Sequence, residues 1–212
     1  MYVCASTADL HNGALEMVMS TSQEEKSKAD ETEWKTLVEE GNEAFNDERS
    51  VIAESKFKEA LELAEKLLEA DKADESKKKS ELKDAEIRVT KSLNNLAALY
   101  HVQGKYGMAE ELYEKCLDMK LNIYGEEHLE TAINLHNLAV LHSAKRSFLK
   151  AELLYKRALE IREKLLGAEH KELVPVLRNY ALLLTKNKRK EEGTVLQQRA
   201  DAIEEAHKAK SV

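Results

Sequence analysis

The 212-residue sequence has little of what β-sheet, secreted and membrane proteins need: one proline, seven glycines, two cysteines and only 5% aromatic residues. So few turn-forming residues argue against a sheet protein with many tight turns. Two cysteines offer no disulfide framework, which indicates a reducing compartment. No run approaches the roughly 18 apolar residues that a membrane span needs. Residues 1–20 contain no lysine or arginine, unlike secretory and mitochondrial targeting sequences. We therefore expect a cytoplasmic protein without a membrane span.

Charge is abundant, at 34% of the residues, and unevenly distributed. Residues 145–190 contain 13 Lys or Arg and 5 Glu, a net charge of +8, so the rest of the chain carries −15 of the total of −7. A basic C-terminal half can steer acidic partners toward that end. The alternative interpretation is that these charges are the solvated faces of amphipathic helices.

One pattern occurs three times between Leu93 and Ile203, with a period of 42 residues. The copies begin LNNLA, LHNLA and LRNYA, which aligns Asn95, Asn137 and Asn179. A weaker copy precedes them, and its spacing to the next copy exceeds the later period by 14 residues. Self-similarity at a fixed period is typical of stacked supersecondary units. We interpret the excess as a longer connection plus extra turns on the following helix.

Apolar residues recur at three- and four-residue steps within each copy, which predicts an all-α protein of antiparallel helix pairs. We expect a flexible leader at residues 1–30, disordered or loosely helical, because no periodicity is sustained there. The first helix is predicted to begin at Glu33. A helical-repeat domain follows at residues 31–208, with a tail at 209–212. Its four repeats are predicted at about 33–70, 82–125, 129–167 and 173–208.

The residue pattern resembles the tetratricopeptide repeat. In that family a small residue lies midway along the first helix of a pair (helix A), and an aromatic and a small residue lie three apart in the second (helix B). Ala97, Ala139 and Ala181 match the first feature; Tyr113–Cys116 and Tyr155–Ala158 match the second. The 42-residue unit with KYGMAEELYEKCL resembles the kinesin light chain class, although the family's His-Pro before helix A is absent. The resemblance implies a right-handed α-solenoid whose A helices line a concave groove, and a non-enzymatic role in protein binding.

Family geometry implies that one face of each A helix lies in this groove. The expected peptide-binding residues are Asn94, Asn95, His101, His136, Asn137, Val140, Arg178, Asn179, Leu182 and Lys186. A carboxamide both donates and accepts hydrogen bonds, so aligned Asn side chains can hold the backbone of an extended peptide. Arg178 and Lys186 are expected to attract carboxylates of an acidic partner segment. The alternative is that the Asn side chains bond across neighbouring helices and only fix the stack.

Other functions find less support in the sequence. The seven His include no i, i+4 pair and no neighbouring Cys, so no metal site or cofactor is expected. No nucleotide-binding motif or nucleophile–base pair indicates an enzyme. The basic cluster 186–190 is interpreted as a solvated turn, and no nucleic-acid partner is expected. A carboxylate clamp for chaperone tails is disfavoured because Val38, Ile133 and Asn137 stand where it needs cations. The second hypothesis is an adaptor that assembles through its convex or end surfaces, with the groove empty or filled by the leader.

Overall fold

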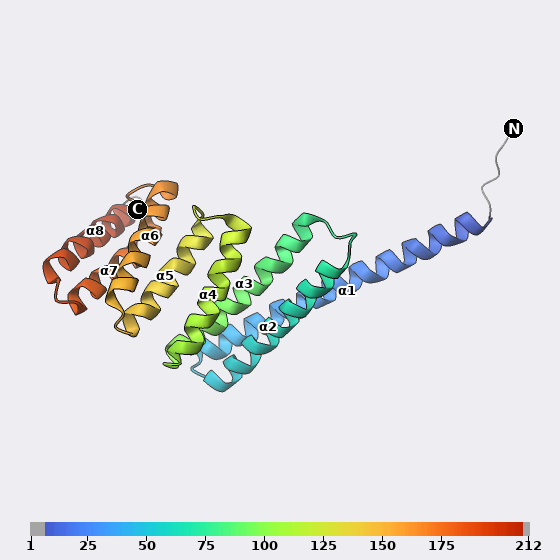
Figure 1. Cartoon of the computed structure of the whole chain (residues 1–212), viewed down its shortest axis with the longest axis horizontal. Helices are drawn as coiled ribbons and strands as arrows, with labels where there is room; N and C mark the ends of the chain where they lie inside the picture. The colour runs from blue at the N-terminus through green and yellow to red at the C-terminus, as the bar shows by residue number, and fades with distance from the viewer. Residues whose placement is uncertain (1–6, 210–212) are drawn as a thin grey trace. The chain divides into compact units, whose positions relative to one another are not determined.

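The computed structural model describes the backbone of residues 7–209 and the side chains of residues 26 and 28–209. Over these residues the chain forms eight α-helices and one short 3-10 helix, and no strand (Figure 1). The prediction of an all-α repeat fold is confirmed. The chain divides into two compact units, Met1–Ser76 (unit 1) and Lys77–Val212 (unit 2).

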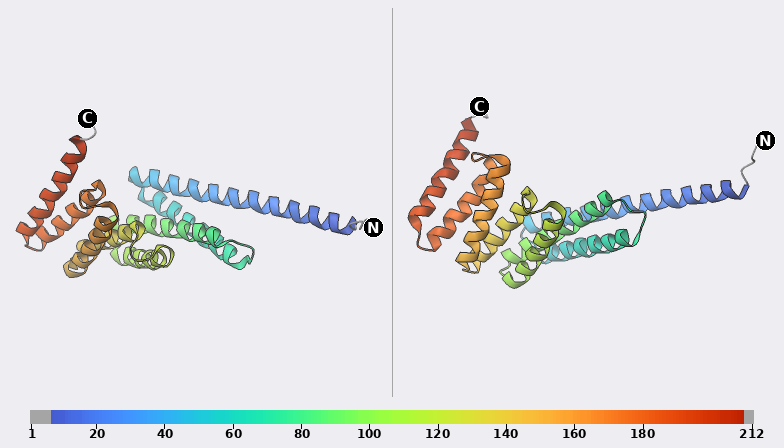
Figure 2. Two further views of the ribbon diagram at one scale, coloured as in Figure 1. Left: turned by 90° about the horizontal axis from the view of Figure 1, so that it is seen from above. Right: turned by 45° about the horizontal axis from the view of Figure 1, so that its top comes forward.

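Unit 1 is one antiparallel helix pair, α1 (Thr7–Asn46) and α2 (Ser50–Ala73) (Figure 2). Helix α2 buries Ala53, Phe57, Ala60, Ala64 and Leu68, which lie three or four residues apart and therefore form one stripe. An ideal Cβ on Gly41 of α1 would lie 2.5 Å from the Phe57 ring. The missing side chain therefore lets the ring pack against the α1 backbone.

Helix α1 begins at Thr7, not at Glu33 as predicted. Residues 14–40 contain no Gly or Pro and are rich in Glu, Lys and Ala, so nothing in them stops the helix. The expected boundary at residue 30 does not coincide with a helix end. Residues 1–6 of the expected leader and the tail beyond residue 209 lie outside the described residues, and the flexibility of the leader stays a prediction.

Unit 2 consists of three helix pairs. They are α3 (Lys79–Val102) with α4 (Tyr106–Tyr124), α5 (Leu129–Ala144) with α6 (Phe148–Leu166), and α7 (Val174–Lys186) with α8 (Lys190–Ala209). A 3-10 turn, η1 (Lys171–Leu173), precedes α7, and Pro175 lies in the first turn of α7, where its missing N–H costs nothing. The helix ends lie within a few residues of the predicted ones, because glycines and short polar turns mark them in the sequence.

The 14 extra residues between the first two copies were expected partly in a longer connection. The connection between α2 and α3 comprises only residues 74–78. The helices take up the rest: α3 has 24 residues where α5 has 16, and α2 has 24 where α4 has 19. The polar stretch EADKADESKKKSELKD lacks Gly and Pro, so most of it continues the two helices.

Each turn from helix A to helix B in unit 2 contains one residue in the left-handed region. These residues are Gly104, Arg146 and Lys188, with φ of 73°, 60° and 64°, and they are 42 residues apart. Glycine adopts this conformation freely, whereas another residue pays about 1 kcal/mol. Two turns therefore hold a cation in a conformation that glycine would adopt without strain.

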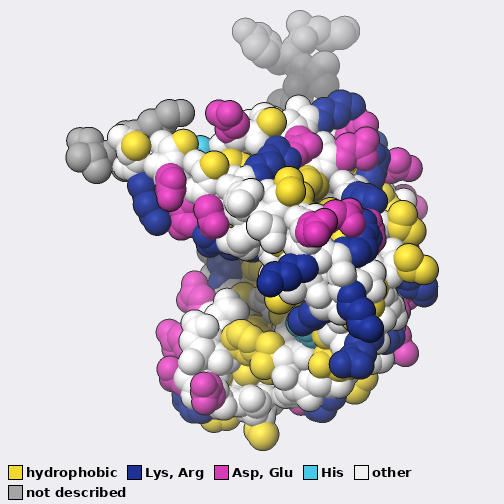
Figure 3. All heavy atoms as spheres, turned by 90° about the vertical axis from the view of Figure 1, so that its left-hand side faces the viewer, with side chains coloured by type: hydrophobic (Ala, Val, Ile, Leu, Met, Phe, Trp, Pro, Cys, Tyr) yellow, Lys and Arg dark blue, Asp and Glu magenta, His cyan; other side chains and the backbone are white. Residues whose placement is uncertain are grey.

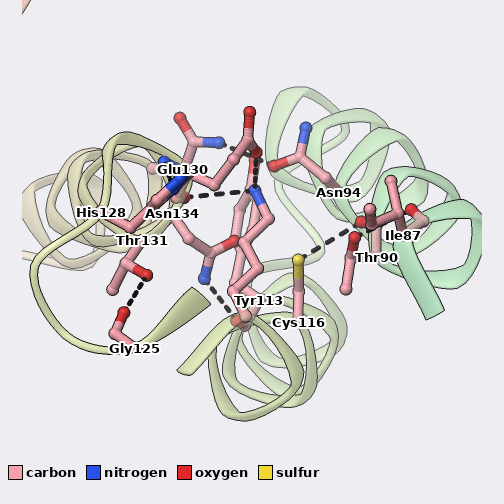
Figure 4. Close-up of polar contacts among 12 residues, drawn as sticks. Ile87, Thr90, Asn94, Tyr113, Cys116, Gly125, His128, Glu130, Thr131 and Asn134 are labelled. Atoms are coloured by element: carbon pink, nitrogen blue, oxygen red, sulfur yellow. Dashed lines mark hydrogen bonds and ion pairs between the residues drawn. The ribbon is translucent and has the colours of Figure 1, made fainter. Parts of the chain in front are cut away.

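Polar contacts at the start of helix A recur with the repeat period, and Figure 4 shows the set at the start of α5. The imidazole Nδ1 of His128 accepts a hydrogen bond from the Glu130 N–H at 3.1 Å, and His170 accepts one from Glu172 at 3.3 Å. The Lys120 Nζ donates to the Glu130 carbonyl oxygen at 3.3 Å, and Arg162 donates to the Glu172 carbonyl oxygen at 2.7 Å. The two histidines cap the helix starts, and the Lys120 and Arg162 contacts fix the starts of α5 and of η1–α7 against the preceding helix B.

Gly193 occupies the small position of α8 that alanine fills in α4 and α6. An ideal Cβ there would lie 2.7 Å from the Ala181 carbonyl oxygen of α7. Gly193→Ala is therefore expected to lower the free energy of unfolding by about 1–2 kcal/mol, although alanine favours helix. Urea unfolding measures the change.

The matched control is Gly107→Ala in the first turn of α4. An ideal Cβ at this position meets no atom within 4 Å. This substitution is expected to add about 0.5–1 kcal/mol through helix propensity alone. If both substitutions changed the free energy of unfolding in the same direction, this result would contradict the close approach of α7 and α8.

Candidate functional site

The expected binding residues lie on the three A helices of unit 2: α3, α5 and α7. Eight of them occupy equivalent positions one repeat apart: Asn94, His136 and Arg178; Asn95, Asn137 and Asn179; and Val140 and Leu182. Each set lies on one side of its helix, because its members are adjacent or about one or two helical turns apart. Arg178, Leu182 and Lys186 are exposed, and the other seven are partly buried. The side of these helices that carries them is called the A-helix face below.

Hydrogen bonds link the A-helix face from one repeat to the next. The Asn137 Nδ2 donates to the Asn94 Oδ1 at 2.8 Å, and Figure 4 shows Asn94 of α3 facing this partner on α5. One repeat further, the Asn179 Nδ2 lies 2.9 Å from the His136 Nε2. Asn137 and Asn179 therefore help to hold the stack together, as the alternative interpretation of the Asn column proposed.

These bonds use only part of the hydrogen-bonding capacity of the side chains. A carboxamide has two N–H donors and an oxygen that accepts twice, and each of these two contacts occupies one such site on a carboxamide. Because Asn94, Asn137 and Asn179 are partly exposed, the remaining sites are open to solvent or to a ligand. A structural role and a binding role are compatible for these three side chains.

His136 is held as a neutral imidazole. Burial, and then the nearby Arg162, lower its pKa to about 4. Because an amide nitrogen can only donate, the His136 Nε2 accepts from Asn179 and the ring proton resides on Nδ1. Burial also lowers the pKa of His101, whose ring centroid lies 5.9 Å from that of Tyr106. At neutral pH the A-helix face therefore gains no positive charge from these two histidines.

Arg178 already has carboxylate partners within the chain. Its guanidinium donates to the Asp201 Oδ1 at 3.1 Å and to the Glu204 Oε2 at 2.5 Å, both on α8. The sequence predicted that Arg178 attracts carboxylates of a partner, but these two acidic residues neutralise it. Asp201 stands where the two preceding copies have leucine, at positions 117 and 159.

The apolar residues of the A-helix face differ in accessibility. Val140 packs against the core of unit 2, whereas Leu182 keeps 52% of its surface exposed. Lys186 follows one turn after Leu182 and is exposed. Leu182 and Lys186 therefore both present exposed surface to a ligand, and neither is engaged by carboxylates as Arg178 is.

Sequence reasoning missed a hollow beside Lys186. It has a volume of about 560 Å³ and lies between the α5–α6 and α7–α8 turns, lined by Ser143, Ala144, Arg146, Phe148, Lys186, Asn187 and Lys188. The signal in the sequence was the alignment of Arg146 and Lys188 with Gly104. A cation in place of a turn glycine in two successive copies marks these turns.

The two units carry net charges of opposite sign. Unit 1 contains 20 Asp or Glu and 8 Lys or Arg, a net charge of −12, and unit 2 has a net charge of +5. Viewed from the α7–α8 side, Lys and Arg side chains are interspersed with acidic ones (Figure 3). Many of these charges pair locally; for example, burial opposes ionisation of Glu152, but hydrogen bonds from Lys156, Arg189 and Tyr180 lower its pKa to about 2.

No helix in the described part of the chain is both long and apolar enough to cross a membrane. Among the described side chains, no three or more His, Cys, Asp or Glu gather into a group that could hold a metal ion.

Residues 88–164 match the family model of the tetratricopeptide repeat. The matched segment runs from the middle of α3 to near the end of α6. No curated protein matches the chain significantly. The tetratricopeptide repeat is a protein–protein interaction module, and no catalytic family is indicated.

Solved structures with the same fold include repeat proteins of the kinesin light chain type. BtubC (BKLC) from P. vanneervenii is 23% identical, with a TM-score of 0.60 over 84% of this chain and 74% of that one. A putative kinesin light chain of Podosopora anserina with nearly identical TPR-like repeats is 18% identical, with a TM-score of 0.53 over 82% and 96%. The apo form of RapI is 15% identical, with a TM-score of 0.67 over 96% and 69%. The predicted resemblance to the tetratricopeptide repeat is confirmed by the family model, and these solved structures share the fold.

Proposed function

We propose that unit 2 binds an extended, acidic segment of a partner protein along the A-helix face. One observation carries the proposal: partly exposed amide and imidazole side chains form a row across α3, α5 and α7, and each has hydrogen-bonding sites left over. Packed helices lie about 8–10 Å apart, and an extended chain advances about 3.3 Å per residue. Successive Asn side chains would then meet backbone groups about three residues apart.

The preference for an acidic segment rests on charge. Unit 2 carries a net charge of +5, and Lys186 makes no ion pair with any of the described carboxylates. Leu182, exposed beside it, offers an apolar contact within the same stretch. A segment with an apolar residue next to an acidic one fits this pair.

A second candidate function is assembly through the B helices. Leu149 and Leu153 of α6 are 78% and 69% exposed, and Val195 of α8, one repeat after Leu153, is 64% exposed. Leu149 and Leu153 are four residues apart and so lie on one side of α6. Exposed apolar residues on one side of a helix are a common feature of protein-binding surfaces. This surface fits the adaptor hypothesis.

A matched pair of substitutions separates the two functions. Leu182→Asp adds a negative charge to the A-helix face, and Leu153→Asp adds one to the outer side of α6; both residues are exposed, so both variants should fold. We expect Leu182→Asp to weaken partner capture in an affinity pull-down by about tenfold or more, and Leu153→Asp to leave it unchanged. Circular dichroism checks the helicity of both.

If Leu153→Asp weakened partner capture and Leu182→Asp did not, the partner would bind the outer surface of the B helices. Loss of the partners with Leu153→Asp alone supports the adaptor hypothesis. Capture that neither substitution changes would contradict both surfaces. The Asn residues are less suitable for this test, because Asn137→Ala also removes a hydrogen bond between α3 and α5.

A further inference from the structure

The hollow between the last two A–B turns of unit 2 is a cationic site that the fold itself does not use. Arg146 comes from the α5–α6 turn, and Lys186 and Lys188 come from the end of α7 and the following turn. None of the three forms an ion pair with a carboxylate among residues 28–209, and no carboxylate lines the hollow. Their positive charges therefore face the open space uncompensated.

Neighbouring cations in the same two turns do form ion pairs. The absence of ion pairs at the three cations of the hollow is therefore informative. Lys145 forms an ion pair with Glu110 of α4. Arg189 forms ion pairs with Glu152 at 2.6 Å and with Glu192 at 2.6 Å. The turns thus contain cations that fix the stack and others that only line the hollow.

Turn geometry does not require these cations. The first turn of unit 2 has Gly104 where the next two have Arg146 and Lys188, and all three residues share the left-handed conformation. Glycine would therefore serve the turn at least as well. A contribution to binding accounts for the two cations where the backbone does not.

The lining specifies the chemistry of a ligand. The three cations, the Ser143 hydroxyl and the Asn187 amide all present hydrogen-bond donors, which match a group that only accepts. A phosphate monoester carries a charge between −1.5 and −2 at neutral pH and three accepting oxygens, so it uses this many donors better than a carboxylate does. Phe148 and Ala144 add an apolar wall for the carbon part of an ester.

We propose that this hollow binds the phosphate group of a phosphorylated side chain on a partner protein. The partner class rests on the proposed function, because Lys186 belongs to both the A-helix face and the hollow. The phosphate site itself does not depend on it. A partner peptide that runs along the A-helix face past Leu182 reaches the hollow at Lys186.

The probe is phenyl phosphate, titrated into the full chain and followed by amide chemical shifts. We expect saturable shifts at residues 143–148 and 186–188, with inorganic phosphate and benzoate each binding at least tenfold more weakly. Arg146→Gly and Lys188→Gly are each expected to weaken phenyl phosphate about tenfold without lowering the thermal unfolding midpoint, because glycine suits these two positions. Lys190→Ala, which removes a cation outside the lining, is the control and is expected to bind normally.

Several results would overturn the proposal. Equal binding of benzoate would make the site a general anion surface, and equal binding of inorganic phosphate would remove the role of the apolar wall. Unchanged binding in both glycine variants would place the phosphate elsewhere. Displacement of the probe by a single-stranded oligonucleotide at lower concentration than by a phosphotyrosine peptide would make the partner a nucleic acid. Leu182→Ala removes the apolar contact of the A-helix face without placing a carboxylate one turn from Lys186, and Leu182 does not line the hollow. In this variant, loss of partner capture with intact phenyl phosphate binding, or the reverse, separates this proposal from the proposed function.

Discussion

Replacement of Tyr155 by alanine is expected to lower the free energy of unfolding of the protein by about 4 kcal/mol. Tyr155 is only 1% exposed. Its ring stacks on that of Tyr180, with 5.6 Å between the ring centroids, and its centroid lies 5.8 Å from that of the His136 ring. Removing the ring loses this contact area and leaves a cavity between α5, α6 and α7. The rigid helices around it can fill such a cavity only in part.

Urea unfolding measures the effect, with Tyr155→Phe as the control. Phenylalanine keeps the ring and its stacking on Tyr180, so its cost is expected to stay below about 1 kcal/mol. A loss of less than 1 kcal/mol in the alanine variant would show that the helix pairs collapse onto the space. The ring would then not be what sets their spacing.

Acid is expected to destabilise unit 2 through His136. The pKa of His136 is lowered in the folded state to about 4, from 6.5 for a free histidine. The folded state therefore binds its proton at a lower pH than the unfolded state does. The contribution of the neutral His136 side chain to the free energy of unfolding is fully present above pH 6.5. It is lost as the pH falls from 6.5 to about 4. A shift of this size corresponds to up to about 3 kcal/mol.

The control for this effect is His136→Gln, whose oxygen can still accept the hydrogen bond from Asn179 but does not titrate. We expect the free energy of unfolding of the wild type to fall more steeply than that of the variant between pH 7.5 and pH 4.5. His101 and His142, whose pKa values burial also lowers, contribute to both slopes alike. Parallel slopes would show that His136 stays accessible to protons.

The sequence predicted the repeat architecture well, because residues of one kind recur at one spacing. Gly125 and Gly167 mark the ends of helices α4 and α6, and both adopt positive φ. The start of α1 was predicted wrongly because a helix can also persist without an apolar stripe, through helix propensity alone. The connection after α2 was predicted too long for the same reason.

The candidate site was harder to predict than the fold. The periodic Asn column predicted a binding face on the A helices, but periodicity cannot show which partner a side chain finds in space. Arg178 meets Asp201 and Glu204, which are 23 and 26 residues away in sequence. The hollow at Arg146 and Lys188 arises from two turns 42 residues apart, and only the stacking brings them together.

The hydrogen bonds of the stack bear on how such a chain can change in length. The lysine or arginine at positions 120 and 162 meets the same carbonyl in the next helix pair, and the histidine caps at 128 and 170 keep the same spacing. Duplication or deletion of one 42-residue segment would join old ends to equivalent new ones and preserve every contact of this kind. An insertion of any other length inside a helix would shift the partners out of register. The fold therefore tolerates the gain or loss of whole 42-residue repeats, but not insertions of a few residues inside a helix.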